Sequence, residues 1–356
     1  MKLKVVTLVD KLNSRIEPLR QSCERFDLEL EVLGDEQTWL RNSFKFRYLY
    51  KYLHENDHSD EDVLLVVDAF DVIIDANEKD LLNAYRNSGS DILFSAEANY
   101  YFREPELTLE YWKRYPRKHG SIYHFLNSGT FIGTIRTIKE LLAEISKAYK
   151  VDFFNDEQLD AIRSDQYLYS RFYVDCKNGK VVPKFSLDLD HDQQFFGCSG
   201  GRMCVTNWPI ISEIQDYLFF KYERRMLKTF RLEKLQIQCR DLKWQNSEKL
   251  QNKLTGSFPL ILHLPGTHKQ FRKAFELMKS GHKMSSVNPS YYAAWMISAI
   301  AYFRSCVNYH YIKLRNKNRG TIRDIFPVAI NRENQVTISS VDPGTFPTDN
   351  PFTINE

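Results

Sequence analysis

The segment VLLVVDAFDVIID, residues 63–75, constrains the fold more strongly than any other part of the chain. Its first part, VLLVV, is apolar at successive positions, which is typical of a central strand covered on both faces of a parallel sheet. The run ends in Asp68, and a second acid, Asp71, follows before the chain becomes apolar again. Because ligands bind at the carboxyl ends of strands in such sheets, Asp68 is expected at the edge where a binding site would form.

Strand and helix patterns alternate around this segment, which predicts an α/β fold. Strands are expected at 4–9, 28–34, 63–67 and 91–97, and helices through Cys23 and at 44–53 and 80–87. Strand–helix–strand units of this spacing form parallel sheets with right-handed crossovers. We therefore expect a Rossmann-like, mainly parallel sheet with helices on both faces.

Asp68 and Asp71 are predicted ligands of a divalent cation. Their spacing would place them on opposite faces of a continuing strand, but a turn through Ala69 and Phe70 would direct both carboxylates at one position. Converging hard oxygen ligands suit such cations. The alternative is that each acid only turns the chain after the strand. The cost of burying two uncompensated charges beside an apolar run favours the cation.

The net charge of +3 conceals an uneven distribution. Acidic residues predominate over 1–201, whereas Lys and Arg greatly outnumber Asp and Glu over 202–323. Such a basic region suggests an anionic partner, such as nucleic acid, a phosphorylated glycan or a membrane surface. A solvated basic surface without a partner is the alternative.

The N-terminus and the cysteines indicate a cytoplasmic protein with reduced thiols. The start MKLKVVTLVD has an apolar run that is shorter than a signal-peptide core of about 7–15 residues. The six cysteines lack the spacing of a zinc site or of a secreted disulfide scaffold. Cys198 and Cys204 bracket a glycine-rich loop and are expected to bridge only in an oxidising compartment.

Changes in composition divide the chain into three predicted regions. Residues 1–275 form the globular domain, 276–325 a basic and aromatic helical C-terminal extension, and 326–356 an irregular tail. The apolar stretch 288–303 is shorter than the roughly 20 residues that span a bilayer. No transmembrane span is therefore expected, and 288–323 would pack on the domain, form a homodimer contact or bind the membrane periphery.

Several motifs occur together in a specific order. They are VDAFDVI (67–73), LFSAE (93–97), YWKRYP (111–116), FLNSGTFIG (125–133), SDQYLYSRFYVD (164–175), LDLDHDQQFF (187–196) and HLPGTHK (263–269). Together they resemble the glycosyltransferase domain of the procollagen lysyl hydroxylase and glycosyltransferase family, over roughly residues 1–275. The resemblance implies a GT-A fold that uses Mn²⁺ to transfer a hexose from a UDP-sugar to an acceptor hydroxyl.

The resemblance also implies roles for individual residues. The metal ligands would be Asp68, Asp71 and His263, and the donor would contact Thr7, Trp39, Lys45, Asp68, Gly266 and Lys269. The implied catalytic residues are Asp165, Glu97 and Asp190, and the implied sugar or acceptor contacts are Asn127, Trp112, Gln166 and His191.

Several of these residues have a structural alternative. Ser164 stands where the family carries an aspartate, and Ser164 and Asp165 would also serve as helix N-caps. NDEQLDAI (155–162) competes with SDQYLYSRFYVD for the acidic motif. Asn127 would also suit a hairpin turn. The alternation in LDLDHD is typical of a half-buried strand. Trp39 and Trp112 would each also suit a position in the core.

Other functions stay open at the level of the sequence. A glycosyltransferase that modifies hydroxymethylated phage-type DNA would explain the basic region. A non-catalytic module that binds nucleic acid or membrane would do so too, although intact metal ligands argue against it. The motifs leave open the hexose, the acceptor and the choice between inverting and retaining chemistry.

Overall fold

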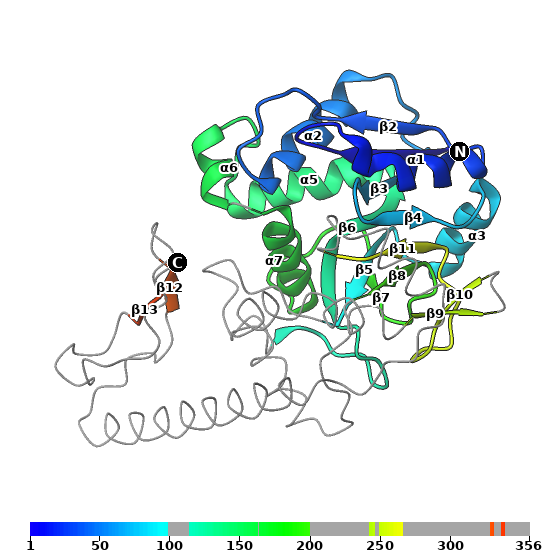
Figure 1. Ribbon diagram of the computed structural model, residues 1–356. Coiled ribbons are helices and arrows are strands. Elements are labelled where there is room, and N and C mark those ends of the chain that lie inside the picture. The colour runs from blue at the N-terminus through cyan, green and yellow to red at the C-terminus, as the bar shows by residue number, and fades with distance from the viewer. Residues whose placement is uncertain are drawn as a thin grey trace, which may run out of the picture.

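The computed structural model describes residues 1–98, 114–162, 164–199, 242–245, 249–265, 328–330 and 336–338 (Figure 1). The predicted helical extension over 276–325 lies outside these residues, as do Trp112, Cys204, Gly266 and Lys269. Among the described helices, none is long and apolar enough to cross a membrane.

Strands and helices alternate through the first part of the chain, as predicted. In chain order they are β1 (Leu3–Leu8), the 3-10 helix η1 (Ser14–Ile16), α1 (Glu17–Arg25), β2 (Leu30–Leu33), the 3-10 helix η2 (Asn42–Phe44), α2 (Lys45–Glu55), β3 (Val63–Asp68), β4 (Val72–Ile74), α3 (Glu78–Ser88), β5 (Ile92–Glu97) and β6 (Phe125–Thr134). Local signals explain the ends of α3, because Asn77 accepts a hydrogen bond from the Asp80 N–H and Gly89 adopts φ 68° just past the helix.

The second part adds three helices and several short strands. These are α5 (Ile135–Tyr149), α6 (Asp156–Ile162), α7 (Asp165–Lys177), β7 (Leu187–Asp190), β8 (Phe196–Cys198), β9 (Leu242–Gln245), β10 (Lys249–Asn252), β11 (Ile261–His263), β12 (Val328–Ile330) and β13 (Val336–Ile338). The pairs β9–β10 and β12–β13 form separate two-stranded sheets.

The central sheet has six strands in the order β2-β1-β3-β6-β5-β7. Within it, β6 runs antiparallel to its neighbours and the remaining pairs are parallel. Residues Val63–Val67 of β3 are all buried, because side chains of α1 and α3 cover one face of the sheet while α2, α5 and α7 cover the other. The predicted α/β fold with a mainly parallel sheet is therefore confirmed.

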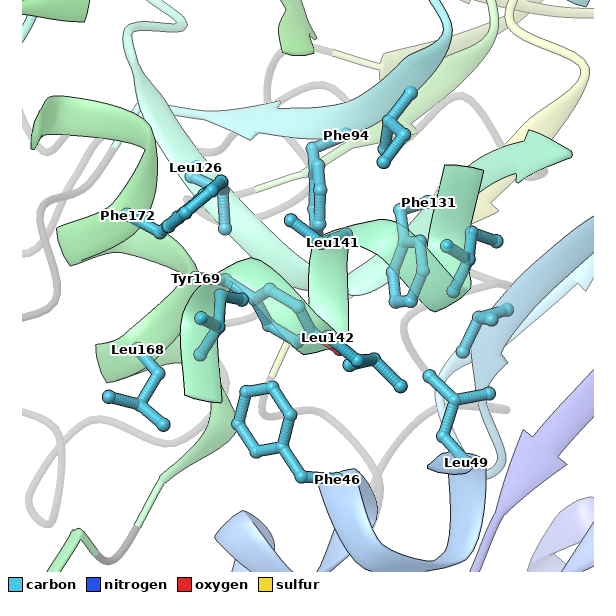
Figure 2. Close-up of a cluster of buried hydrophobic side chains, with 14 of the residues drawn as sticks. Phe46, Leu49, Phe94, Leu126, Phe131, Leu141, Leu142, Leu168, Tyr169 and Phe172 are labelled. Atoms are coloured by element: carbon cyan, nitrogen blue, oxygen red, sulfur yellow. The ribbon is translucent and has the colours of Figure 1, made fainter. Parts of the chain in front are cut away.

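Aromatic packing holds α2 and α7 against the sheet. Phe46 of α2 packs on Tyr169 of α7 with ring centroids 4.7 Å apart, and Phe94 and Phe131 pack at the same distance within the sheet (Figure 2). Each buried side chain of this size contributes about 1.5–3 kcal/mol through removal of apolar surface from water. This packing brings the first residues of both helices to the end of β3.

A second, three-stranded sheet lies beside the end of β3, in the order β4-β11-β8 (Figure 1). In this sheet β11 runs antiparallel to β4 and parallel to β8, so that His263 is in register with Val72 and with Cys198. The chain after Asp71 is thus paired with a strand almost two hundred residues further along the sequence. This pairing places His263 beside the two aspartates.

Candidate metal and donor site

Asp68, Asp71 and His263 converge at the end of β3. Their potential ligand atoms all lie within 4.8 Å of one another. His263 Nε2 is 3.7 Å from Asp68 Oδ2 and 3.6 Å from Asp71 Oδ1. The turn through Ala69 and Phe70 separates β3 from β4, so the predicted convergence of the two carboxylates is present in the structure.

Backbone pairing holds the three side chains in place. The Leu264 N–H donates to the Asp71 carbonyl at 2.9 Å, which extends the β4–β11 pairing up to the turn. Thr7 supports the end of β3 from the other side, because its hydroxyl donates to the Val67 carbonyl at 2.7 Å. Thr7 is fully buried. The predicted donor contact of Thr7 stays a prediction, while its visible role is to anchor the strand that carries Asp68.

His263 has the properties of a metal ligand. Its side chain is buried, and neither ring nitrogen has a hydrogen-bond partner within the described part of the chain. Burial alone would lower the pKa of His263, but Asp71 and Cys198 raise it well above its ordinary value. An imidazole nitrogen beside two carboxylates offers the nitrogen and oxygen ligands that divalent cations bind. The residues therefore fit a divalent cation.

Lys45 connects this group to Asp165. Its Nζ lies 2.5 Å from Asp68 Oδ1 and 3.7 Å from Asp165 Oδ2. Burial would lower the pKa of Lys45, but Asp165 and Asp68 raise it above its ordinary value, so the ammonium stays charged. Asp68 thus directs one oxygen at Lys45 and the other at His263. The predicted contact of Lys45 with the donor stays a prediction.

Asp165 begins α7 and is almost fully buried at 4% exposure. Burial raises its pKa above the ordinary value, although Lys45 and a hydrogen bond from Ser128 oppose the change. Ser164 occupies the N-cap position but makes no side-chain capping bond. The competing acidic segment lies elsewhere, because Asp156 pairs with Arg47 and Asp160 with Arg41.

Glu97, Asn127 and Gln166 form one hydrogen-bonded group. Glu97 Oε1 accepts from Asn127 Nδ2 at 3.2 Å and from Gln166 Nε2 at 2.8 Å. Asn127 lies inside β6 and not in a hairpin turn. All three side chains come from the strand ends and helix start that border the cation ligands, so their predicted roles at the sugar or acceptor stay open to test.

Asp190 and His191 hold the turn between β7 and β8. Asp190 Oδ1 accepts from the Gln194 N–H and Oδ2 accepts from the N–H groups of Phe195 and Phe196. His191 Nδ1 lies 2.6 Å from the Tyr123 carbonyl oxygen. Burial raises the pKa of Asp190 and lowers that of His191. Their visible role is to position β8, and a contact with substrate stays a prediction.

Within the described part of the chain, Asp188 and Asp192 of LDLDHD belong to no group of potential metal ligands. Asp188 pairs with Lys177, and Asp192 pairs with Lys118. Trp39 stacks on Tyr48 with ring centroids 5.4 Å apart and is half-buried, so it packs against the domain whether or not it also contacts a nucleoside.

Sequence reasoning missed three residues at this site. Ser128 forms a hydrogen bond with Asp165. The backbone at Gly129 passes directly beside His263 and Asp68. Cys198 is a buried free thiol that lies in register with His263. Asn-Ser-Gly indicates a turn when read locally, and only the pairing of β6 shows that these residues belong to a strand.

Comparisons with known proteins identify the class. Residues 1–203 match the protein family described as the PLOD GT domain. The human multifunctional procollagen lysine hydroxylase and glycosyltransferase LH3 is 30% identical over 210 residues, which cover 57% of this chain and 26% of that protein. The procollagen-lysine,2-oxoglutarate 5-dioxygenase 1 of Gallus gallus is 26% identical over 209 residues, or 56% of this chain and 26% of that protein.

A solved structure aligns with most of the chain at a low TM-score. The crystal structure of a glycosyltransferase involved in the glycosylation of the major capsid of PBCV-1 aligns with a TM-score of 0.36 and 8% identity, covering 77% of this chain and 99% of that one. The chain spans about a quarter of the length of the curated relatives it matches.

The family match and the α/β architecture define the class of the chain, a glycosyltransferase domain built on a mainly parallel sheet. Within that class, the chain belongs to the PLOD glycosyltransferase domain family.

Proposed function

We propose that this glycosyltransferase moves a hexose from a UDP-sugar to an acceptor hydroxyl, with Mn²⁺ held by Asp68, Asp71 and His263. The observation that carries the proposal is the convergence of the potential ligand atoms of two carboxylates and a buried imidazole within 4.8 Å of one another. This ligand set suits Mn²⁺ better than Zn²⁺, which prefers sulfur and nitrogen ligands in closed sites.

The cation would neutralise the negative charge that develops on the departing diphosphate. Lys45 carries a second positive charge to the same edge of the sheet, where it lies between Asp68 and Asp165. In this proposal its ammonium orients the donor phosphates, and Lys269, predicted from HLPGTHK, adds another point charge. Thr7 and Trp39 are the proposed nucleoside contacts.

Asp165 is the proposed acid or base closest to this charge network. A carboxyl group whose pKa is raised toward the working pH is better suited to proton transfer, and burial raises the pKa of Asp165. Glu97 would orient sugar or acceptor hydroxyls, with Asn127 and Gln166 holding its carboxylate through the hydrogen bonds described above.

Donor hydrolysis without an acceptor tests the proposal. We expect the full-length protein to release UDP from UDP-glucose or UDP-galactose when Mn²⁺ is present. Release should stop with EDTA and recover when excess Mn²⁺ is restored, because the metal-free site lacks the charge that stabilises the diphosphate. Equal UDP release with EDTA and with Mn²⁺ would contradict the proposed role of the cation.

The acceptor we propose is a hydroxylysine-like protein side chain or a glycan hydroxyl. The names of the curated relatives support the protein acceptor. The basic region over 202–323 favours a second candidate, a hydroxymethylated DNA base or another anionic acceptor. We also propose a cytoplasmic location and the division into regions 1–275, 276–325 and 326–356.

Salt dependence separates these acceptors. If the basic region binds an anionic partner, we expect binding to DNA or acidic liposomes at low salt, and a steep fall as salt rises, because neutralised phosphates release counterions. Changing Lys313, Arg315, Lys317 and Arg319 to glutamate should weaken that binding and spare UDP release. Fluorescence anisotropy measures binding to DNA, and liposome flotation measures binding to membranes. Binding whose strength does not change with salt concentration would favour the neutral acceptor.

A further inference from the structure

β6 departs from regular pairing beside the proposed cation site. Its register with β5 shifts, so that Phe94 pairs with Phe131 but the next residue, Ser95, pairs with Asn127. On the other side, β3 pairs with β6 only as far as Thr130. Ser128 and Gly129 are therefore left without a partner strand in the described sheet, which is the signature of a β-bulge.

Side-chain amides satisfy the backbone of this bulge. The Gly129 N–H donates to Asn127 Oδ1 at 2.9 Å, and the Ser128 N–H donates to Gln166 Oε1 at 3.3 Å. Both amides also donate to Glu97, as described above. Buried N–H groups that lose their ladder partners need such replacements, so the bulge is a built feature of the strand.

The position of Gly129 requires a glycine for space and not for conformation. Its φ lies outside the left-handed range in which several other glycines of the chain are found. A β-carbon added there would lie 2.3 Å from His263 Cε1 and 2.6 Å from Asp68 Oδ2. Both distances are far below van der Waals contact. The two closest atoms therefore belong to two of the three proposed cation ligands, and the third neighbour, Asn127 Oδ1, would lie 3.0 Å away.

His263 has little room to move away from such an atom. It is buried, and β11 is paired on one side with β4 and on the other with β8. Asp68 Oδ2 is the oxygen that faces His263, while Oδ1 is engaged by Lys45. Added bulk at residue 129 would therefore push the imidazole and the carboxylate out of their common position.

We propose that Gly129 is a positioning residue of the cation site, whose bare α-carbon allows Asp68 and His263 to converge. This inference rests on the proposed function. It also explains the bulge, which brings the β6 backbone against the side chains of Asp68 and His263. The glycine at this position leaves room for both. Neither the identity of the metal ligands nor the fold alone gives Gly129 this positioning role.

Mn²⁺ affinity of the full-length protein tests the inference without relying on activity. We expect Gly129→Ala to weaken Mn²⁺ binding, measured by isothermal calorimetry with Mn²⁺ alone, by about tenfold or more, as for other changes that misorient metal ligands. Gly133→Ala is the matched control on the same strand. Its β-carbon would meet the Asp91 carbonyl and the Ile92 and Ile138 side chains at 3.1–3.3 Å, so Mn²⁺ affinity should be unchanged.

A double-mutant cycle in EDTA tests the contact itself and covers the case in which Gly129→Ala folds poorly. Thermal unfolding should show that Gly129→Ala lowers Tm, and that more than half of the loss disappears when His263→Ala removes the ring it would strike. Gly133→Ala should lower Tm by the same amount in the wild-type protein and in the His263→Ala protein. Wild-type protein that binds no Mn²⁺ would overturn the proposed function itself, whatever the cycle shows.

Two results would overturn the role of Gly129 while leaving the proposed function standing. One is wild-type Mn²⁺ affinity in a folded Gly129→Ala protein. The other is a stability loss in Gly129→Ala that neither His263→Ala nor Asp68→Ala reduces, because the added atom would then act through contacts other than these two side chains.

Discussion

Replacing Asp71 with alanine is expected to lower Mn²⁺-dependent UDP release by at least about 100-fold, as expected when a group that stabilises developing charge is lost, while the protein stays folded. The substitution removes one of the two carboxylates that converge with His263. It keeps the Asp71 backbone carbonyl that accepts from Leu264, so the β4–β11 pairing is preserved. Asp68→Ala should lower activity to a similar extent, because it removes the other carboxylate.

Asp75→Ala is a matched control on the same segment. Asp75 is half-buried and its carboxylate lies 3.6 Å from Arg25, which belongs to α1 and not to the site. Activity should therefore persist in this variant. UDP release over a Mn²⁺ titration, with circular dichroism to verify folding, measures all three. If Asp68→Ala and Asp71→Ala both retained metal-independent turnover at the wild-type rate, the cation site would be wrongly assigned.

Replacing Lys45 with methionine is expected to cost about 3 kcal/mol of unfolding free energy at neutral pH, since one partner is removed from a buried charge pair. The ammonium lies beside the carboxylates of Asp68 and Asp165, and Asp165 is 4% exposed. In the variant, the Asp165 carboxylate would stay buried but would lose the positive charge of Lys45 beside it. Activity should also fall, because the proposed donor phosphates lose the same charge.

The pH dependence of this loss follows from the direction of the Asp165 pKa. Burial raises that pKa in the folded protein, so the protonated acid favours folding, and this contribution is lost as pH rises through the folded pKa. Removing Lys45 raises the pKa further. The deficit of Lys45→Met should therefore be largest at neutral pH and shrink toward about pH 4, near the ordinary pKa of aspartate.

Urea unfolding at both pH values measures this difference. Lys51→Met on the same helix is the control, because Lys51 makes no ion pair with a described residue. It should change stability little at either pH. A deficit of Lys45→Met that is equal at neutral and acidic pH would show that Lys45 stabilises the fold by packing and not by charge.

Local patterns in the sequence determined the elements that carry the two aspartates. The uninterrupted apolar run of residues 63–67 requires cover on both faces, and β3 is indeed buried throughout that run. The turn through Ala69 and Phe70 and the placement of Asp68 and Asp71 at the strand end follow from the same segment. Such features depend on neighbouring residues alone, which is why periodicity and turn chemistry predict them.

The tertiary structure decided how distant segments meet at the site. His263 reaches the aspartates because β11 pairs with β4, and Lys45 reaches Asp165 because aromatic packing sets α2 against α7. Gly129 matters only because β6 bulges where His263 arrives. None of these contacts has a local signature, since each depends on pairing and packing energies summed over residues far apart in the chain. The sequence of the Asn-Ser-Gly segment is compatible with both a hairpin turn and a strand, and only its neighbours in space select the strand.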